Sequence, residues 1–318
     1  MMRALLAAAL IACATAAHPQ AYPSGPIKLI VPWPPGGGVD TSARIIAQPL
    51  SQRLGQSIVV DNRPGAGGNI GTAAAAAAKP DGYTLLMGSV SPNAINVHLY
   101  SRLGFDPAKD FAPIVFLTLV PNILVVPANS PANSAHELIK LAKDNPGKIN
   151  YGSGGVGSSQ HLAAAMFIKS TGVDIVHVPY KGTAPAEADL IAGHISMLLD
   201  TTACLPFVAA GKMKALAVAS KARNPALPNV PTFDELGIPG VLSASWYGLM
   251  APAGTPRAVI DKINSEVNAL LRTPEMRKRL ADFGGEVGGG TPEDFGRFMA
   301  GETARYADIV KASGAKVD

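Results

Sequence analysis

The sequence predicts an α/β protein whose two lobes are joined by two crossing strands. The chain has 318 residues, a length that suggests two domains with a buried core in each. Its composition is 47% hydrophobic and only 16% charged, which excludes a disordered chain because such chains are poor in apolar residues. Short apolar segments alternate with helical segments at a spacing of about 25–30 residues, the pattern of parallel βαβ units.

Residues 1–21 are predicted to be an export signal. Arg3 precedes an apolar stretch, and small residues at 14–17 resemble a cleavage site. Residues 10–13 also resemble the cleavage site of a bacterial lipoprotein, so a lipid anchor on Cys13 stays an alternative. Cleavage would leave Cys204 alone, which excludes an internal disulfide and favours a small buried thiol. No later apolar run approaches the ~20 residues that span a bilayer, so we expect a soluble exported protein.

The first part of the chain is expected to alternate strands with helices. Pro49 falls inside the first helix and is expected to kink it. Parallel pairing of the strands follows from the alternation. The expected strands are 28–32, 57–61 and 83–87, and the expected helices are 40–54 and the Ala-rich segment ending near residue 79.

Two apolar runs, 114–120 and 123–126, are expected to leave one lobe and enter the other. A second alternation follows, with strands at 149–151, 175–178, 195–199 and 215–219 and helices at 134–143, 158–170, 184–193 and 205–210. The chain is then expected to end with a strand at 245–250 and helices at 256–271, 274–282 and 292–312. This order predicts a discontinuous first domain, residues 22–122 and 246–318, and a second domain, residues 123–245.

The charge balance argues against a nucleic-acid partner. Lys and Arg total 27 against 23 Asp and Glu, a net charge of +4, and the basic residues form no run. A nucleic-acid-binding protein concentrates positive charge on one face, so no nucleic-acid binding is expected.

Four glycine-rich loops follow predicted strands, at 32–40, 65–71, 88–91 and 152–161. Ligands of open parallel sheets bind at such strand ends, where free backbone N–H groups and helix dipoles converge. Backbone and hydroxyl donors without Arg favour an anion, most simply a carboxylate. Any one loop can instead be a simple tight turn, but four at equivalent strand ends indicate a site. The hydroxyl donors in these loops are Ser89, Ser153, Ser158 and Ser159.

A dinucleotide site is one alternative. Gly152, Gly154 and Gly157 fit the pattern G-x-G-x-x-G between a predicted strand and a predicted helix. However, the next predicted strand does not end in the acidic residue expected to bind the ribose. This alternative corresponds to a nicotinamide-dependent oxidoreductase.

A hydrolase is the other enzyme alternative. Ser158, Ser159, His161 and Asp200 could form a nucleophilic constellation, although a helix N-terminus disfavours an imidazolium at His161. No Cys/His cluster has the spacing of metal ligands. Asp40 could cap its helix or contact a ligand. Two further side chains, Trp33 and Trp246, could belong to the core or line a cleft.

Six motifs together resemble the Bug family. They are PWPPGGGVD (32–40), DNRPGAGGNIG (61–71), KPDGYTLLMGS (79–89), INYGSGGVGSSQHLA (149–163), VPYKGTAPA (178–186) and WYGLMAPAGTP (246–256). The resemblance runs in the same order from about residue 23 to the C-terminus. Bug proteins are the periplasmic solute-binding components of tripartite tricarboxylate transporters. The resemblance implies a type II periplasmic binding protein fold, with the ligand cleft between the two lobes.

The resemblance also implies the function. Bug proteins bind small carboxylates, including di- and tricarboxylates, amino acids and aromatic acids, and deliver them to a membrane permease with one large and one small subunit. A periplasmic monomer without cofactor, metal or catalytic activity is therefore expected. The secreted enzymes described above are the alternative function.

Carried over motif by motif, the resemblance implies which residues contact the ligand. Trp33 stands where Bug proteins often have Phe, a difference that could change which ligand body fits. The expected ligand contacts are Trp33, Pro35, Gly36, Gly37, Asp40, Asn69 and Ser89 from the first lobe, and Ser153, Ser158, Ser159, His161, Tyr180, Gly182 and Asp200 from the second.

Overall fold

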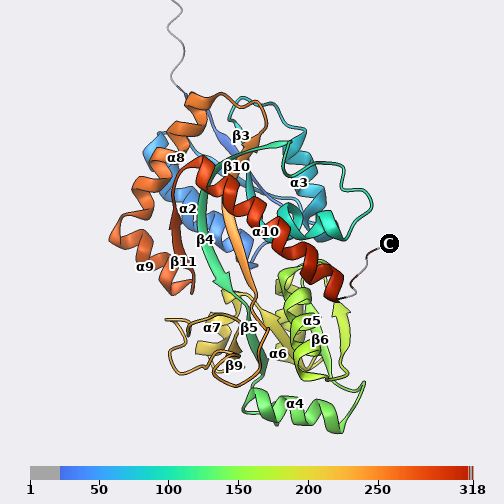
Figure 1. The fold of residues 1–318 in the computed structure, drawn as a ribbon. Coiled ribbons are helices and arrows are strands. Elements are labelled where there is room, and N and C mark those ends of the chain that lie inside the picture. The colour runs from blue at the N-terminus through green and yellow to red at the C-terminus, as the bar shows by residue number, and fades with distance from the viewer. Residues whose placement is uncertain (1–21, 314, 316, 318) are drawn as a thin grey trace, which may run out of the picture.

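Two β-sheets organise the chain into two lobes (Figure 1). The computed structural model describes residues 22–313, 315 and 317. The expected export signal, residues 1–21 with Cys13, lies outside the described residues. We call lobe I the six-stranded sheet with its helices, and lobe II the five-stranded sheet with its helices.

The sheet of lobe I has the strand order β11-β4-β10-β3-β1-β2. Strand β1 pairs in parallel with β2 and β3, as the alternation predicts, whereas β10 and β11 run antiparallel to their neighbours. The strands are β1 (Ile27–Val31), β2 (Ile58–Asn62), β3 (Thr84–Ser89), β4 (Phe111–Pro121), β10 (Ala244–Pro252) and β11 (Glu286–Gly289).

Helices cover both faces of this sheet because its strands are apolar on both sides. Along β3, Leu85 and Met87 join the core cluster that contains α2 and α8 residues, whereas Leu86 joins the cluster that contains α10 residues. This alternation is the period of two that β-strands impose on side chains. The helices are α2 (Gly38–Leu54), α3 (Asn69–Ala76), α8 (Arg257–Leu271), α9 (Pro274–Asp282) and α10 (Pro292–Ser313), with shorter helical turns η1 (Ala66–Gly68), η2 (Ser91–Ile95) and η3 (Asn96–His98).

The sheet of lobe II has the strand order β7-β6-β8-β5-β9. Strand β6 is parallel to β7 and β8, and β5 is antiparallel to β8 and β9. The strands are β5 (Ile123–Pro127), β6 (Asn150–Ser153), β7 (Val176–Pro179), β8 (Met197–Asp200) and β9 (Met213–Val218). The helices are α4 (Ala135–Asp144), α5 (Ser159–Thr171), α6 (Thr183–Ala192), η4 (Thr202–Cys204) and α7 (Leu205–Ala209).

The chain crosses between the lobes twice, along β4 into β5 and back along β10 (bounds above), as the sequence predicts. Strand β4 of lobe I continues into β5 of lobe II with Asn122 as the single residue between them. The chain returns to lobe I through residues 219–243 and strand β10. The expected two-lobed α/β architecture is therefore confirmed.

The structure corrects several local predictions. Helix α2 begins at Gly38 with Gly37 as its N-cap, so Asp40 lies in the first turn and does not cap the helix. The helix runs to Leu54 with Pro49 inside it, so the kink expected there stays a prediction. Strand β3 extends to Ser89, so half of the expected 88–91 loop is strand, and α3 ends at Ala76 rather than near residue 79.

The described residues hold neither a membrane-spanning helix nor a cluster of metal-ligating side chains. Among residues 22–313, 315 and 317, no helix combines the length and apolar character needed to cross a membrane. The same residues contain no group of three or more His, Cys, Asp or Glu side chains that could hold a metal ion.

Candidate ligand-binding cleft

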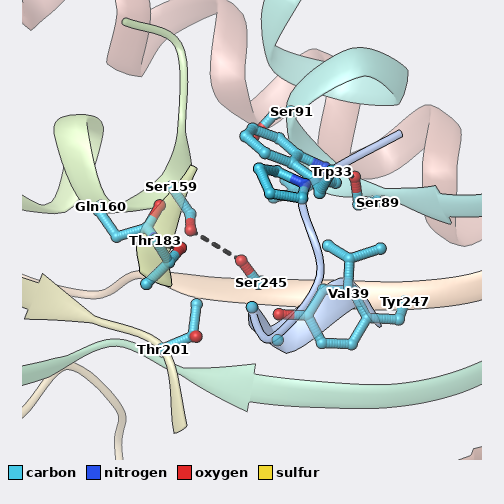
Figure 2. A pocket seen from close by; sticks show the side chains of 14 residues that line it. Trp33, Val39, Ser89, Ser91, Ser159, Gln160, Thr183, Thr201, Ser245 and Tyr247 are labelled. Carbon is cyan, nitrogen blue, oxygen red and sulfur yellow. Dashed lines mark hydrogen bonds between the residues drawn. The ribbon is translucent and has the colours of Figure 1, made fainter. Parts of the chain in front are cut away.

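A small cavity lies between the lobes at the carboxyl ends of strands β1, β3 and β8. Its volume is about 30 Å³, room for about two water molecules. Figure 2 shows Trp33, Ser89 and Ser91 on one side and Gln160 and Thr183 on the other. The lining residues are Trp33, Pro34, Gly37, Gly38, Val39, Ser89, Val90, Ser91, Ser159, Gln160, Thr183, Thr201, Ser245 and Tyr247.

Two helices from opposite lobes begin at this cavity without a side-chain cap. The N-caps of α2 and α6 are Gly37 and Gly182, and neither helix has a capping hydrogen bond from the N-cap side chain. The first N–H groups of a helix have no partner within the helix, and they carry the positive end of its dipole. Their lobes therefore bring two anion-attracting helix ends to one place.

Hydroxyl and amide groups complete the lining. Trp33 Nε1 donates to Ser89 Oγ at 3.1 Å, which fixes the indole against the end of β3. Gln160 Nε2 donates to Thr183 Oγ1 at 2.7 Å. None of the described residues that line the cavity carries a charged side chain, so an anion here would be held by dipoles and hydrogen bonds.

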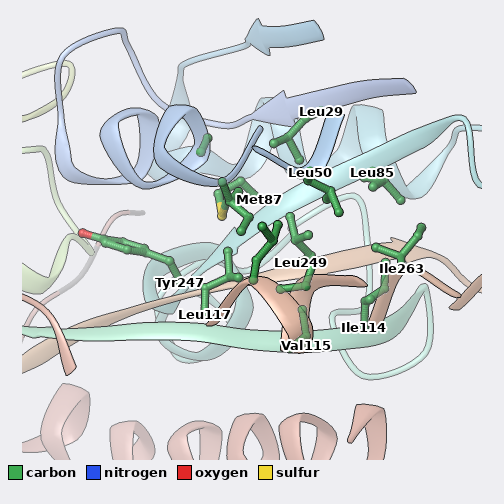
Figure 3. Close-up of a cluster of buried hydrophobic side chains, with 14 of the residues drawn as sticks. Leu29, Leu50, Leu85, Met87, Ile114, Val115, Leu117, Tyr247, Leu249 and Ile263 are labelled. Carbon is green, nitrogen blue, oxygen red and sulfur yellow. The ribbon is translucent and has the colours of Figure 1, made fainter. Parts of the chain in front are cut away.

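The crossing strand β10 supplies the floor of the cavity. The hydroxyls of Ser245 on β10 and Ser159 on α5 are hydrogen-bonded at 2.7 Å, so β10 is tied to lobe II at this point (Figure 2). Tyr247 belongs to the core of lobe I, and its hydroxyl end reaches out of that core (Figure 3). A Cβ on Gly38 would lie 2.5 Å from that hydroxyl, so only glycine fits there.

Glycines also allow the lobes to touch around the cavity. A Cβ on Gly182 of lobe II would lie 2.6 Å from Pro34 of lobe I, and a Cβ on Gly157 would lie 2.6 Å from Asn96. Gly182 and Gly157 have φ of +117° and +83°, a region that other residues rarely adopt. These glycines therefore serve the contact between the lobes.

Four of the predicted ligand contacts line the cavity: Trp33, Gly37, Ser89 and Ser159. The others lie around it or behind its walls. The first group of these is the loop before α2, where Pro35 and Gly36 are exposed and Gly36 lines a second, outer cavity between the lobes.

Asp40 holds that loop rather than facing the cavity. Its carboxylate is buried and accepts hydrogen bonds from the Gly36 amide, the Arg44 guanidinium and the Asn62 side chain. Burial disfavours the carboxylate, but the hydrogen bonds from Arg44, Gly36 and Asn62 outweigh it and lower the pKa of Asp40. Asp40 therefore stays ionised and shapes the loop.

The predicted contacts at the start of α5 support the loop from behind. Ser158 is the N-cap of α5, and its hydroxyl donates to the Gly155 carbonyl at 2.7 Å. Ser153 Oγ is hydrogen-bonded to His177 Nε2 at 2.7 Å. The His161 ring stacks on His177 with centroids 4.4 Å apart, and burial lowers the pKa of His161 to about 4. A neutral His161 contributes no positive charge to an anion site.

The remaining predicted contacts form hydrogen bonds away from the cavity, cap a helix or are buried behind the cavity wall. Asn69 accepts a hydrogen bond from Asn96 at 2.6 Å, and the Tyr180 hydroxyl donates to Asp189 at 2.6 Å. Gly182 caps α6 against Pro34, as described above. Asp200 is fully buried beneath Thr201, the residue that does line the cavity.

Sequence reasoning missed ten lining residues. Most of them lie one or two residues from a predicted contact in the sequence. Ser245 and Tyr247 differ, because their strand gave only a core-like signal. The missed residues are Pro34, Gly38, Val39, Val90, Ser91, Gln160, Thr183, Thr201, Ser245 and Tyr247.

The geometry does not assemble the nucleophilic constellation. Ser159 Oγ is bonded to Ser245 and Ser158 Oγ to a carbonyl, while the Nδ1 atom of His161 accepts from the Gly157 amide at 3.4 Å. The glycine fingerprint does lie between β6 and α5, but Pro179 ends the next strand and no acidic side chain stands there. Neither enzyme alternative gains support from the described residues.

Comparisons with known proteins point in one direction. The model of the tripartite tricarboxylate transporter family receptor matches residues 42–315. The chain is 38% identical to the protein BugT of Bordetella pertussis over 298 residues, 93% of this chain and 91% of BugT. It is similar to the solved structure of R. palustris Rpa4515 with adipate, at 39% identity and a TM-score of 0.91, covering 93% of this chain and 100% of that one. It is also similar to MatC from Rhodopseudomonas palustris with bound malate, at 32% identity and a TM-score of 0.86, covering 91% and 100%.

Proposed function

Because this chain belongs to the tripartite tricarboxylate transporter receptor family, we propose that it is a periplasmic protein that captures a small carboxylate between its two lobes. Family membership confirms the Bug resemblance carried by the six sequence motifs. We also propose that the protein delivers its ligand to a membrane permease of one large and one small subunit, a partner that only the family name suggests.

One observation carries the proposal. The N-terminal ends of α2 and α6, from opposite lobes, meet at a cavity lined by hydroxyl, amide and backbone groups. Hydrogen bonds to a charged group contribute about 1.5–3 kcal/mol each, so four or five donors can reach micromolar affinity without Arg or Lys. A neutral ligand would not profit from the two helix ends.

The ligand class is a dicarboxylate of about four to six carbons, because the similar solved proteins are described with adipate and malate. The cavity of about 30 Å³ is too small for either acid, whose pockets normally measure at least about 300 Å³. Entry therefore requires the lobes to separate and then to close again around the acid, with the cavity lining rearranged to make room for it.

Calorimetric titration with adipate and malate tests this function. Both acids should bind, and the diamide of adipic acid, which has the same shape without charge, should not. Ser89→Ala and Ser159→Ala should each weaken binding by about tenfold or more, since each removes a donor to a charged group. Ser170→Ala is the matched control, because Ser170 lies at the far end of α5 and its hydroxyl donates to the Pro239 carbonyl.

Two results would contradict the proposal. One is the absence of binding by adipate, malate and a panel of amino acids and aromatic acids at millimolar concentration. The other is equal binding of the diamide and the diacid, which would show that charge plays no part.

A further inference from the structure

Two carboxyl groups lie against each other behind the lobe II wall of the cavity. Glu187 on α6 is 3% exposed and Asp200 at the end of β8 is 0% exposed. They lie close enough for each to influence the pKa of the other. Asp200 Oδ1 also accepts from the Thr201 amide at 2.7 Å. Within the described part of the chain, Glu187 Oε1 and Asp200 Oδ2 have no hydrogen-bond donor, so a proton between the two groups is what would satisfy them.

No cationic side chain of the described residues acts on this pair. Burial and the charge of Glu187 raise the pKa of Asp200 well above its usual range, and burial raises the pKa of Glu187. Two like charges this close cannot both ionise, so the pair holds at least one proton at neutral pH. Two titratable groups on neighbouring elements act on the pair or feel its charge, Cys204 of η4 and Tyr247 of β10. The elements β6 and α5, which pack against β8, carry Tyr151 and His161. Asp282 of α9, paired with Lys278, lines the outer cavity together with Glu187.

The pair is connected to the ligand cavity through three side chains. Thr201, the residue after Asp200, lines the cavity. Gln160 also lines it; its side chain donates to Thr183 Oγ1 and lies close enough to Asp200 to influence the pKa of that carboxyl. Thr183 opens α6 one helical turn, about 5.4 Å, before Glu187. A carboxylate in the cavity would therefore sit within roughly 10 Å of the pair, close enough to change its protonation.

Resting on the proposed function, we propose that the protein takes up a proton from solvent onto the Glu187–Asp200 pair when it captures a carboxylate. Before binding, the pair shares one proton and keeps one negative charge. The ligand's charge then favours the second proton, which neutralises the pair. By linkage, affinity for the carboxylate must fall as pH rises from the pKa at which the free pair loses its second proton to the higher pKa at which the liganded pair loses it.

The titratable groups around the Glu187–Asp200 pair do not change their charge over the pH range in which the proton uptake is measured. Burial lowers the pKa of His161 to about 4, below neutral pH. Burial and the charges of the pair raise the pKa of Cys204, and burial raises the pKa of Tyr247, so both stay neutral. Between about pH 7 and 9 the carboxylates of adipate are fully ionised as well. Proton uptake in this range therefore reports on the pair.

Calorimetric titration of the whole protein with adipate, and in parallel with malate, tests the proposal at pH 7, 8 and 9. Each titration is run in two buffers of different ionisation enthalpy, so that the difference in heat counts the protons taken up per ligand. We expect between about half and one proton at the pH of greatest uptake, and an affinity that weakens about tenfold across the range. Binding with no proton uptake at any of these pH values would overturn the inference while leaving the proposed function intact.

Amide variants assign the proton to this pair. Glu187→Gln with Asp200→Asn should abolish both the uptake and the pH dependence, while adipate still binds. Asp282→Asn is the control, because Asp282 lines the outer cavity together with Glu187. This variant should keep both the proton uptake and the pH dependence of binding. Uptake that persists in the double variant would overturn the assignment, and in case that variant does not fold, Glu187→Gln alone must reduce the uptake. No binding of either acid to the wild type would overturn the proposed function and this inference together.

Discussion

Asn122 and Ser243 are hydrogen-bonded to each other twice, and they stand on the two segments that join the lobes. The Ser243 hydroxyl donates to the side-chain oxygen of Asn122, Oδ1, at 2.8 Å. The backbone N–H of Asn122 donates to the Ser243 carbonyl at 2.9 Å. Asn122 Nδ2 also donates to the Leu199 carbonyl at 3.0 Å, one residue before Asp200. Both residues are fully or almost fully buried, so the two crossings form one unit at the hinge.

Asn122→Ala should therefore lower the free energy of unfolding by about 2 kcal/mol, because it removes the buried hydrogen bonds of the Asn122 side chain with the Leu199 carbonyl and the Ser243 hydroxyl. Chemical denaturation checks this value. Asn133→Ala, which removes an exposed asparagine of lobe II, is the matched control and should change stability by less than about 0.5 kcal/mol. Equal effects of the two substitutions would show that the hinge hydrogen bonds do not stabilise the fold.

Gly182→Ala should weaken adipate binding by about tenfold, because the added Cβ would lie 2.6 Å from Pro34 and hold the lobes apart. Gly193→Ala is the control for backbone strain, since Gly193 also has a positive φ but no atom within 4 Å of the added Cβ. Gly193→Ala should lower stability and leave affinity unchanged. Pro34→Ala in the Gly182→Ala background should restore part of the affinity. Equal losses of affinity in both glycine variants would contradict a role in lobe contact.

Much of the fold could be predicted from the sequence because its signals are local. Strands β4 and β5 are separated by one residue, Asn122, and the break between their apolar runs is visible in the sequence. Strand β11, with the sequence EVGG, has no such signal and forms only by pairing with β4. The sequence places the start of α2 two residues too late, because Asp is a residue type that often caps helices. In the structure Asp40 lies in the first turn, and its carboxylate accepts a hydrogen bond from the Gly36 amide.

The site was predicted less completely because long-range contacts decide which side chains reach it. Ser89 ends β3, Ser159 opens α5, and both line the cavity. His161 looked equally well placed, but a stack with His177 of β7 turns its ring into lobe II. Ser245 reaches the cavity only because its strand passes between the lobes, a placement no local pattern reveals.

Trp33→Phe should raise the affinity for adipate relative to malate by about threefold or more. The indole lines the cavity and is fixed by its hydrogen bond to Ser89, so a smaller, unfixed ring leaves room for a longer ligand. The ratio of the two dissociation constants checks this effect. Trp246→Phe is the control, because Trp246 is 0% exposed and packs against Phe295, so this change should lower stability and leave the ratio unchanged. An unchanged ratio in Trp33→Phe would show that Trp33 does not set ligand length.

Acid should destabilise the fold through His161. Burial lowers the pKa of His161 from 6.5 to about 4, so between these values the unfolded chain binds a proton that the folded protein refuses. Stability from this residue is therefore present above pH 6.5 and lost as pH falls, by about 2 kcal/mol between pH 7 and 5. The Glu187–Asp200 pair acts in the opposite direction, since raised carboxyl pKa values favour the folded state in acid.

The contribution of His161 is isolated by comparing urea denaturation of the wild type and His161→Gln at pH 7 and pH 5. His136→Gln, an exposed substitution, is the control. The wild type should lose more stability than His161→Gln on acidification, and an identical loss would exclude His161 as the acid-sensitive group.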